Sequence, residues 1–237
     1  MAAPVKTYRG FLLDADNTLF DYDGAEKESL TETLREAAPA IPLEQALSAY
    51  REINAAFWRR LEEGTVTLAT LKVGRFVSLL ESLGVPGDPH KFSEGYLARL
   101  SRKAYLLPHA RETVGELSRR AALCLVTNGI SVVQRGRLER AGIASLFKAV
   151  LISEELGMTK PDRRFFQAAV DALGLPPSEL LCVGDNPSTD IAGAQEAGID
   201  ACWFAPDGRS WPGPGKAPVA TIRDLREIEK FAPAVFQ

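Results

Sequence analysis

The stretch 8–23, YRGFLLDADNTLFDYD, decides the fold of this chain. A short apolar run ends abruptly at Asp14, and a second carboxylate, Asp16, follows two residues later. Such a run, closed by polar residues, is typical of a buried strand. A strand-to-turn junction explains an isolated DADNT, because Asp and Asn favour turns. Two close carboxylates also suggest a cation site, because they share a proton or need a positive charge, and their oxygens suit Mg²⁺.

The segment 21–107, which follows this strand, shows helical periodicity and little strand signal. Apolar residues recur at steps of three or four in LEQALSAYREINAAFWRRL (43–61) and in TLATLKVGRFVSLLESLG (67–84). The second pattern ends at Gly84, the residue type expected just past a helix. Residues 88–103 suggest another helix, so the whole segment is predicted to be helical.

After Pro108 the pattern changes to short apolar runs that alternate with helical patterns. The predicted strands are AALCLVTNG (121–129), KAVLIS (148–153), ELLCVGDN (179–186), IDACWFA (199–205) and VATI (219–222). The predicted helices are RGRLERAGI (135–143), DRRFFQAAVDALG (162–174), STDIAGAQEAG (188–198) and RDLREIEKFA (223–232), and a Gly/Pro-rich loop spans 206–218. This alternation predicts an α/β fold with a parallel sheet and helices on both faces. Ligands of such sheets bind beyond the carboxyl ends of the strands.

Composition narrows the function classes. The chain has 237 residues, enough for one large domain or for a core with a smaller insert. A formal net charge of −3 gives no electrostatic reason to expect nucleic acid or an anionic membrane as partner. Cys124, Cys182 and Cys202 lie in separate apolar runs without CxxC spacing, which indicates reduced core cysteines. No secretion signal or membrane span is recognised, so we expect a cytoplasmic protein, monomeric or weakly self-associating.

Four polar features follow the predicted strands, and each has an ordinary structural explanation. Thr127, Asn128 and Gly129 in LVTNG form a strand end and turn, or an anion site made of a hydroxyl and backbone N–H groups. Lys160 in GMTKPD is a surface lysine, or a counter-charge for phosphate.

Asp185 and Asp190 in VGDNPSTD follow a later apolar run. Both residues suit the first turn of a helix, where acids are favoured, and they also suit a metal site. Because carboxyl ends of parallel strands share one edge of a sheet, all four features are able to meet in one cleft.

The order of these motifs resembles the haloacid dehalogenase-like hydrolase superfamily. The matching residues are Asp14-Ala15-Asp16-Asn17-Thr18, then Thr127, then Lys160-Pro161, then Gly184-Asp185 through Asp190. The resemblance implies a Rossmann-like core made of residues 1–20 and 108–237, with a helical cap domain inserted at 21–107. Dehalogenases of the superfamily usually carry Tyr where Asp16 stands, whereas mutases share the same motifs.

Several further segments resemble the bacterial pyrimidine 5′-nucleotidase branch of that superfamily. They are DADNTLFDYD, FWRRLEEGTVT, GRF, VTNG, RLERAGI, LISEELGMTKPD and CWF. The branch usually has Glu where this chain has Asn17, a position outside the required set. The resemblance implies hydrolysis of nucleoside monophosphates such as UMP, dUMP and dTMP. The alternatives are another small phosphate ester, such as a sugar phosphate or phosphoglycolate, or a non-catalytic binding protein on the same fold.

The resemblance also implies the role of each residue. Asp14 is expected to attack phosphorus, and Asp16 to act as acid and then base. Mg²⁺ is expected to be held by the Asp14 and Asp185 carboxylates and the Asp16 carbonyl.

The phosphate is expected to be held by Thr127, by the backbone around Asn128 and Gly129, and by Lys160, with Asp190 in support. The residues expected to select the substrate lie in the helical segment and are Tyr22, Phe57, Trp58 and Arg75. Aromatic rings stack on bases and Arg binds base carbonyls, although Phe57 also fits the apolar face of its helix and Arg75 fits a solvated helix surface.

Overall fold

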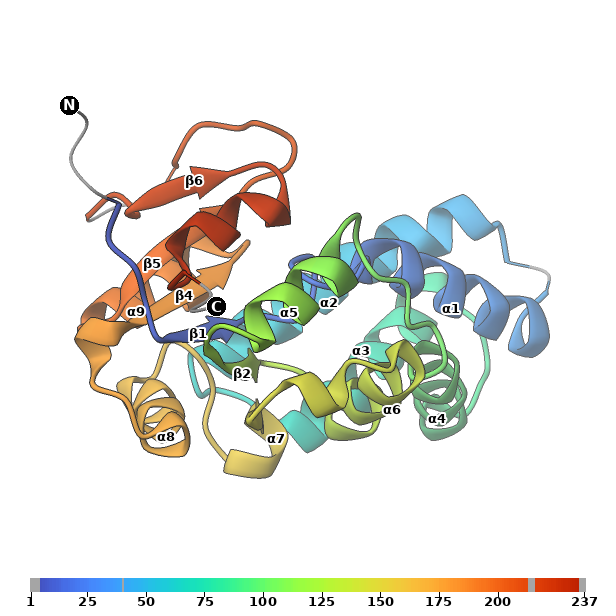
Figure 1. Cartoon of the computed structure of the whole chain (residues 1–237). Helices are drawn as coiled ribbons and strands as arrows, with labels where there is room; N and C mark the ends of the chain where they lie inside the picture. Colours follow the sequence, from blue (N-terminus) through green and yellow to red (C-terminus); the bar gives the residue numbers. More distant parts are fainter. Residues whose placement is uncertain (1–4, 40, 213–215, 235–237) are drawn as a thin grey trace. The chain divides into compact units, whose positions relative to one another are not determined.

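A computed structural model describes residues 5–39, 41–212 and 216–234 of the protein (Figure 1). The chain forms two compact units. One unit contains the chain up to Asp21 together with the chain from Ala104 onward, and the other spans Tyr22–Lys103. We call them the core unit and the helical unit. Part of the predicted Gly/Pro-rich loop, residues 213–215, lies outside the described residues.

The core unit is built on a six-stranded sheet with the strand order β3-β2-β1-β4-β5-β6. The strands are β1 (Gly10–Leu13), β2 (Ala122–Thr127), β3 (Ala149–Ile152), β4 (Leu180–Gly184), β5 (Asp200–Phe204) and β6 (Ala220–Ile222). Every neighbouring pair is parallel. The predicted parallel α/β sheet is therefore confirmed. The order reverses between β1 and β4, which is where open sheets of this type bind ligands.

The register of the three central strands aligns their carboxyl ends. Leu13, the last residue of β1, pairs with Leu125 of β2 on one side and with Val183 of β4 on the other. The backbone N–H of Asp14 continues this ladder and donates to the Val183 carbonyl at 3.0 Å. Residues that follow β1, β2 and β4 therefore lie at one edge of the sheet.

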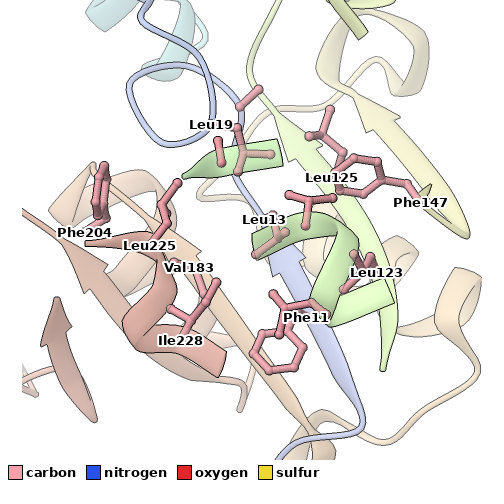
Figure 2. Packing of buried hydrophobic residues seen from close by; sticks show 14 of the residues in the cluster. Phe11, Leu13, Leu19, Leu123, Leu125, Phe147, Val183, Phe204, Leu225 and Ile228 are labelled. Atoms are coloured by element: carbon pink, nitrogen blue, oxygen red, sulfur yellow. The ribbon is translucent and has the colours of Figure 1, made fainter. Parts of the chain in front are cut away.

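Alternate residues of the strands supply two hydrophobic clusters. Phe11 and Leu13 of β1 belong to the first cluster, and Leu12 between them belongs to the second. Figure 2 shows members of the first cluster, with Phe11, Leu13, Leu123 and Leu125 gathered against Phe147, Val183, Phe204, Leu225 and Ile228. Both faces of the sheet are thus covered, as near-continuous apolar strands require.

Helices lie in the connections between the strands of the core unit, except in the described part of the connection from β5 to β6. They are α5 (Ala110–Ser118), α6 (Ser131–Ala141), α7 (Ser153–Leu156), α8 (Arg163–Leu173) and α9 (Gly193–Glu196), with 3₁₀ turns at Ala144–Leu146 and Pro177–Glu179. Two of the predicted helices are not α-helical throughout. Pro187–Ala192 is a π-helical segment that leads into α9, and Leu225–Phe231 is a 3₁₀ helix that starts at a capping box of Asp224 and Glu227.

The helical unit consists of α1 (Tyr22–Ala37), α2 (Leu43–Glu62), α3 (Leu68–Leu83) and α4 (Pro89–Leu100). The helices predicted from periodicity at 43–61 and 67–84 match α2 and α3. Gly84 follows α3 with a left-handed φ of 63°, which glycine adopts without steric cost. Inside the unit, the rings of Tyr50, Phe76 and Tyr96 pack with centroids 5.4 to 5.7 Å apart. Among the described helices, none is both long and apolar enough to cross a membrane.

Candidate active site

Asp14 directly follows the central strand β1, and its side chain is almost fully buried. Lys160, which is 1% exposed, donates from Nζ to Asp14 Oδ1 at 2.7 Å and to Asp190 Oδ1 at 2.6 Å. A third bond reaches the Val126 carbonyl at 2.9 Å. Burial opposes the ammonium charge, but the Asp14 and Asp190 carboxylates outweigh this and raise the pKa of Lys160 above its usual range. Lys160 is therefore a fixed cation between two carboxylates.

The side chain of Asn128 holds Lys160 in place. Its Oδ1 accepts from the Lys160 backbone N–H at 2.7 Å, and its Nδ2 donates to the Lys160 carbonyl at 2.8 Å. These paired bonds connect the loop after β2 to the loop before α8. From the sequence we expected only the backbone around Asn128 to be used, so this role of the side chain was missed.

Asp190 lies in the π-helical segment and is 1% exposed. Its Oδ2 accepts the backbone N–H of Asn186 at 3.0 Å, while Oδ1 faces Lys160. A Cβ on Gly184, the last residue of β4, would lie 2.3 Å from Asp190 Oδ2. Only glycine leaves room for the carboxylate here, so the end of β4 is shaped to admit Asp190.

The carboxylates of Asp14, Asp185 and Asp190 each place an oxygen within 4.8 Å of the others. Burial raises the pKa of Asp14 to about 7, with Asp190 adding to the shift and Lys160 opposing it. Burial and the charges of Asp14 and Asp190 raise the pKa of Asp185 to about 8. One lysine does not balance this negative charge. The cluster therefore fits a hard divalent cation with oxygen ligands, as expected for Mg²⁺.

This cluster predicts an unusual dependence of stability on pH when divalent cations are removed. The pKa values of Asp14 and Asp185 are raised in the folded state from an ordinary value of 3.8, so the folded chain binds more protons than the unfolded chain. Stability is then lost as the pH rises through the folded values. In the presence of chelator, we expect the melting temperature to fall by several degrees from about pH 5 to about pH 9.

Thermal unfolding followed by circular dichroism, with chelator or with Mg²⁺, tests this expectation. Mg²⁺ should restore most of the loss at high pH, because the cation favours the ionised carboxylates. Replacing Asp185 by Asn should flatten the profile obtained with chelator. A melting temperature that stays constant or rises over this range in chelator would show that the carboxylates are not held in this way.

Asp16 lies in the tight turn that follows Asp14. The turn is closed by the bonds from Leu19 and Phe20 N–H to the Ala15 carbonyl and from Asn17 N–H to the Phe20 carbonyl. Asn17 has a φ of 60°, a conformation that Asn tolerates better than most side chains. This explains why an asparagine suits the position.

Two residues of α6 bind the Asp16 carboxylate. Gln134 Nε2 donates to Oδ2 at 2.7 Å, and Arg137 Nη1 donates to Oδ1. Sequence reasoning missed both. Gln134 lies just before the helix predicted at 135–143, and Arg137 lies in a segment noted only for its helical pattern and its family resemblance. Both residues are more than a hundred positions from Asp16 in the chain.

Thr127 and Gly129 flank Asn128 at the end of β2. Thr127 is the last residue of the strand and is buried, and Gly129 precedes the start of α6. The hydroxyl of Ser153 donates to the Gly129 carbonyl at 3.3 Å. By strand register, this loop lies at the same edge of the sheet as Asp14, as its proposed role in phosphate binding requires.

The four residues expected to select the substrate all belong to the helical unit. Arg75 is 1% exposed and donates to Asn54 Oδ1 at 2.9 Å, and Phe57 is also buried. Tyr22 and Trp58 are partly exposed, and the Tyr22 hydroxyl donates to Glu26. Phe57 and Arg75 are thus buried inside the helical unit. Of the four residues predicted to select the substrate, Tyr22 and Trp58 have surface accessible to solvent.

Comparison with known proteins gives a consistent assignment. Residues 8–198 match the family model described as haloacid dehalogenase-like hydrolase. The chain is 33% identical to pyrimidine 5′-nucleotidase YjjG of Escherichia coli (strain K12), over 92% of this chain and 95% of that protein. It is 35% identical to a phosphoserine phosphatase of Thermus thermophilus, over 86% of this chain and 83% of that protein.

A solved structure supports the same conclusion. The HAD-hydrolase YfnB of Bacillus subtilis, described as bound to magnesium, superimposes with a TM-score of 0.86 at 32% identity. The alignment covers 94% of this chain and 97% of that one. The fold, the order of the motifs, the family model, the similar sequences and the solved structure agree. The chain belongs to the haloacid dehalogenase-like hydrolases.

Proposed function

We propose that the protein is a Mg²⁺-dependent phosphatase that hydrolyses nucleoside 5′-monophosphates of the pyrimidine type. The observation that carries this proposal is the set of groups around Asp14. A buried carboxylate at the end of the central strand contacts a buried lysine at 2.7 Å and lies beside two further carboxylates. A second acidic side chain, Asp16, is held separately by α6.

In the first half-reaction, Asp14 attacks phosphorus in line with the ester bond. A bond forms between an Asp14 oxygen and phosphorus while the bond from phosphorus to the ester oxygen breaks. Asp16 gives its proton to the departing oxygen, which leaves as the nucleoside hydroxyl. The product on the protein is an aspartyl-phosphate, which divides one difficult displacement into two easier ones.

In the second half-reaction, a water molecule attacks the phosphorus of the aspartyl-phosphate. Asp16, now ionised, removes a proton from this water as the bond from phosphorus to Asp14 breaks. Phosphate leaves, the Asp14 carboxylate is restored, and Asp16 again holds a proton. One side chain thus serves as acid and then as base.

The remaining groups hold charge during both steps. In this proposal Lys160 and the Thr127–Gly129 loop bind phosphoryl oxygens, which is supported by the bonds with Asn128 and Asp190 that keep Lys160 in position. Mg²⁺, held by Asp14, Asp185 and the Asp16 carbonyl, would offset the repulsion between an anionic nucleophile and an anionic ester. Preorganised charges of this kind account for much of the rate enhancement in phosphoryl transfer.

The choice of substrate class rests on the similarity to pyrimidine 5′-nucleotidase YjjG. Tyr22 and Trp58 of the helical unit stay the predicted base-binding residues. Aromatic rings of this kind stack on bases without needing a particular hydrogen-bond pattern. A second candidate is another small phosphate ester, such as a sugar phosphate or phosphoserine, and the name of the Thermus thermophilus relative favours phosphoserine. A non-catalytic role is disfavoured, because every motif position carries a competent residue.

A substrate panel tests the proposal directly. With Mg²⁺ present, we expect kcat/KM for UMP or dUMP to exceed that for phosphoserine and sugar phosphates by roughly tenfold or more, a difference of about 1.4 kcal/mol in transition-state binding. Release of inorganic phosphate is measured for each ester at equal concentrations. Chelator should abolish all activity. A preference for phosphoserine or a sugar phosphate would contradict the nucleotidase assignment. Activity that persists in chelator would show that the reaction does not depend on a divalent cation.

A further inference from the structure

The carboxylate of Asp16 is bound through both of its oxygens by one face of α6. Gln134 Nε2 donates to Oδ2 at 2.7 Å and Arg137 Nη1 donates to Oδ1. The two donors are three residues apart on the helix, so they point the same way. A carboxylate has about four acceptor positions, so two bonds leave others free for a proton or a substrate.

The donors and the acceptor differ in exposure. The side chain of Arg137 is 0% exposed, whereas that of Asp16 is 27% exposed. Gln134 is buried as well. A buried guanidinium is costly unless it is paired. The buried side chains of Arg137 and Gln134 therefore hold a carboxylate that is itself accessible to solvent. This arrangement fixes the orientation of Asp16 without burying it.

Two features of the surrounding chain support this anchoring. The guanidinium carbon of Arg137 lies 4.3 Å from the ring centroid of Phe20, and Phe20 closes the turn that contains Asp16. On the other side, a Cβ at Gly129 would lie 2.3 Å from Gln134 Nε2, the atom that donates to Asp16. Gly129 thus leaves the space through which Gln134 reaches the carboxylate.

We propose that Arg137 and Gln134 are positioning residues that orient the Asp16 carboxyl group for proton transfer to the ester oxygen. The inference rests on the proposed function, in which Asp16 is the acid of the first half-reaction and the base of the second. The two donors exchange no proton with substrate. They restrict the carboxyl to the orientation in which one oxygen delivers its proton as the ester bond breaks.

This role predicts a dependence on the leaving group. A nucleoside alkoxide needs a proton to depart, whereas p-nitrophenolate does not. General acid catalysis contributes about 10² to 10⁴-fold. We therefore expect Arg137→Met to lower kcat/KM for UMP roughly 10²-fold and to change kcat/KM for p-nitrophenyl phosphate by less than about 3-fold. The ratio kcat/KM is used because it reports phosphoryl transfer to the protein and not the later hydrolysis.

Further variants separate positioning from a structural role. Gln134→Met should also lower kcat/KM for UMP more than for p-nitrophenyl phosphate, with a smaller loss than Arg137→Met. This variant tests the proposal if Arg137→Met does not fold. Arg137→Lys should recover part of the UMP activity. Arg140 is an exposed arginine of the same helix, and Arg140→Met should leave kcat/KM unchanged for both esters. In an Asp16→Asn background, Gln134→Met should cause little additional loss, because the group that it positions is already gone.

The outcomes distinguish this inference from the proposed function. Asp16→Asn is expected to lower kcat/KM for UMP and to spare p-nitrophenyl phosphate. If it does so, but Arg137→Met and Gln134→Met lower kcat/KM equally for both esters, the positioning role is refuted and Asp16 remains the acid. If Asp16→Asn itself shows no selectivity, the acid assignment fails. If the unmodified protein hydrolyses neither ester, the phosphatase assignment fails.

Discussion

Replacing Asp14 by Asn is expected to reduce phosphatase activity by roughly 10⁴-fold or more, as removal of a nucleophile does in enzymes with covalent intermediates. The substitution keeps the shape of the side chain and removes the anionic oxygen that is proposed to attack phosphorus. It also removes one of the crowded carboxylates around Lys160, so the fold should be retained. Activity is measured as kcat/KM with UMP and with p-nitrophenyl phosphate, because both esters need the nucleophile.

Two controls accompany this variant. Asp171→Asn changes an exposed carboxylate of α8 that accepts a bond from Gln167, and it should leave kcat/KM unchanged. Circular dichroism and thermal unfolding should show that Asp14→Asn is folded. A folded variant that keeps a tenth or more of the activity on either ester would exclude Asp14 as the nucleophile.

Replacing Lys160 by Met is expected to affect both activity and stability. Lys160 bonds to Asp14 and Asp190 in a buried setting, and removing one partner of a buried ion pair typically costs about 3–5 kcal/mol. We expect a loss of about 3 kcal/mol in the free energy of unfolding, measured with urea at pH 8 in chelator. The loss should be smaller at pH 5, where the raised pKa of Asp14 leaves that carboxyl protonated.

The Lys160→Met result can be separated from general damage to the core. The double variant Lys160→Met/Asp190→Asn removes a second charge and should regain part of the stability. It should not regain activity, because the cation that is proposed to bind the phosphoryl oxygens is still missing. Lys27→Met, at an exposed position of α1, should alter neither quantity. Full activity in the single variant, or no rescue of stability in the double variant, would contradict the role of Lys160 as a buried cation between two carboxylates.

The sheet was predictable from sequence because each strand is a short apolar run that closes in polar or glycine residues. The runs that form β1, β2, β4 and β5 are buried on both faces, so their signal is local and strong. The helices α2 and α3 were predictable for the same reason, since their apolar residues recur at helical spacing. The first helix, α1, was covered only by the general assignment of 21–107 to helix. Two of its buried residues, Ser29 and Thr33, are polar, which weakens the apolar pattern.

The helices at 188–198 and 223–232 were predicted, but their type was not, because local patterns do not reveal hydrogen-bond spacing. The segment Pro187–Ala192 adopts a π-helical form, and Asp190 within it reaches Lys160. That contact depends on a lysine 30 positions away in the chain. The 3₁₀ form of Leu225–Phe231 is likewise not visible in the apolar pattern of 223–232.

The candidate site divides in a similar way. Asp14, Asp185 and Lys160 carry motif signals, and the structure brings them together with Asp190. The bonds from Gln134 and Arg137 to Asp16 join positions that no local pattern connects. The burial of Arg75 could not be anticipated either, because its partner Asn54 belongs to a different helix.

The central claim, a phosphoryl group carried by Asp14, is tested most directly by trapping it. Asp16→Asn lacks the base of the second half-reaction, and p-nitrophenyl phosphate needs no acid in the first, so the intermediate should accumulate. Mixing this variant with phosphorus-labelled p-nitrophenyl phosphate, quenching with acid and mapping the peptides should place the label on Asp14, with a burst of about one nitrophenolate per protein. A label on another residue, or a burst without any label on the protein, would contradict the mechanism.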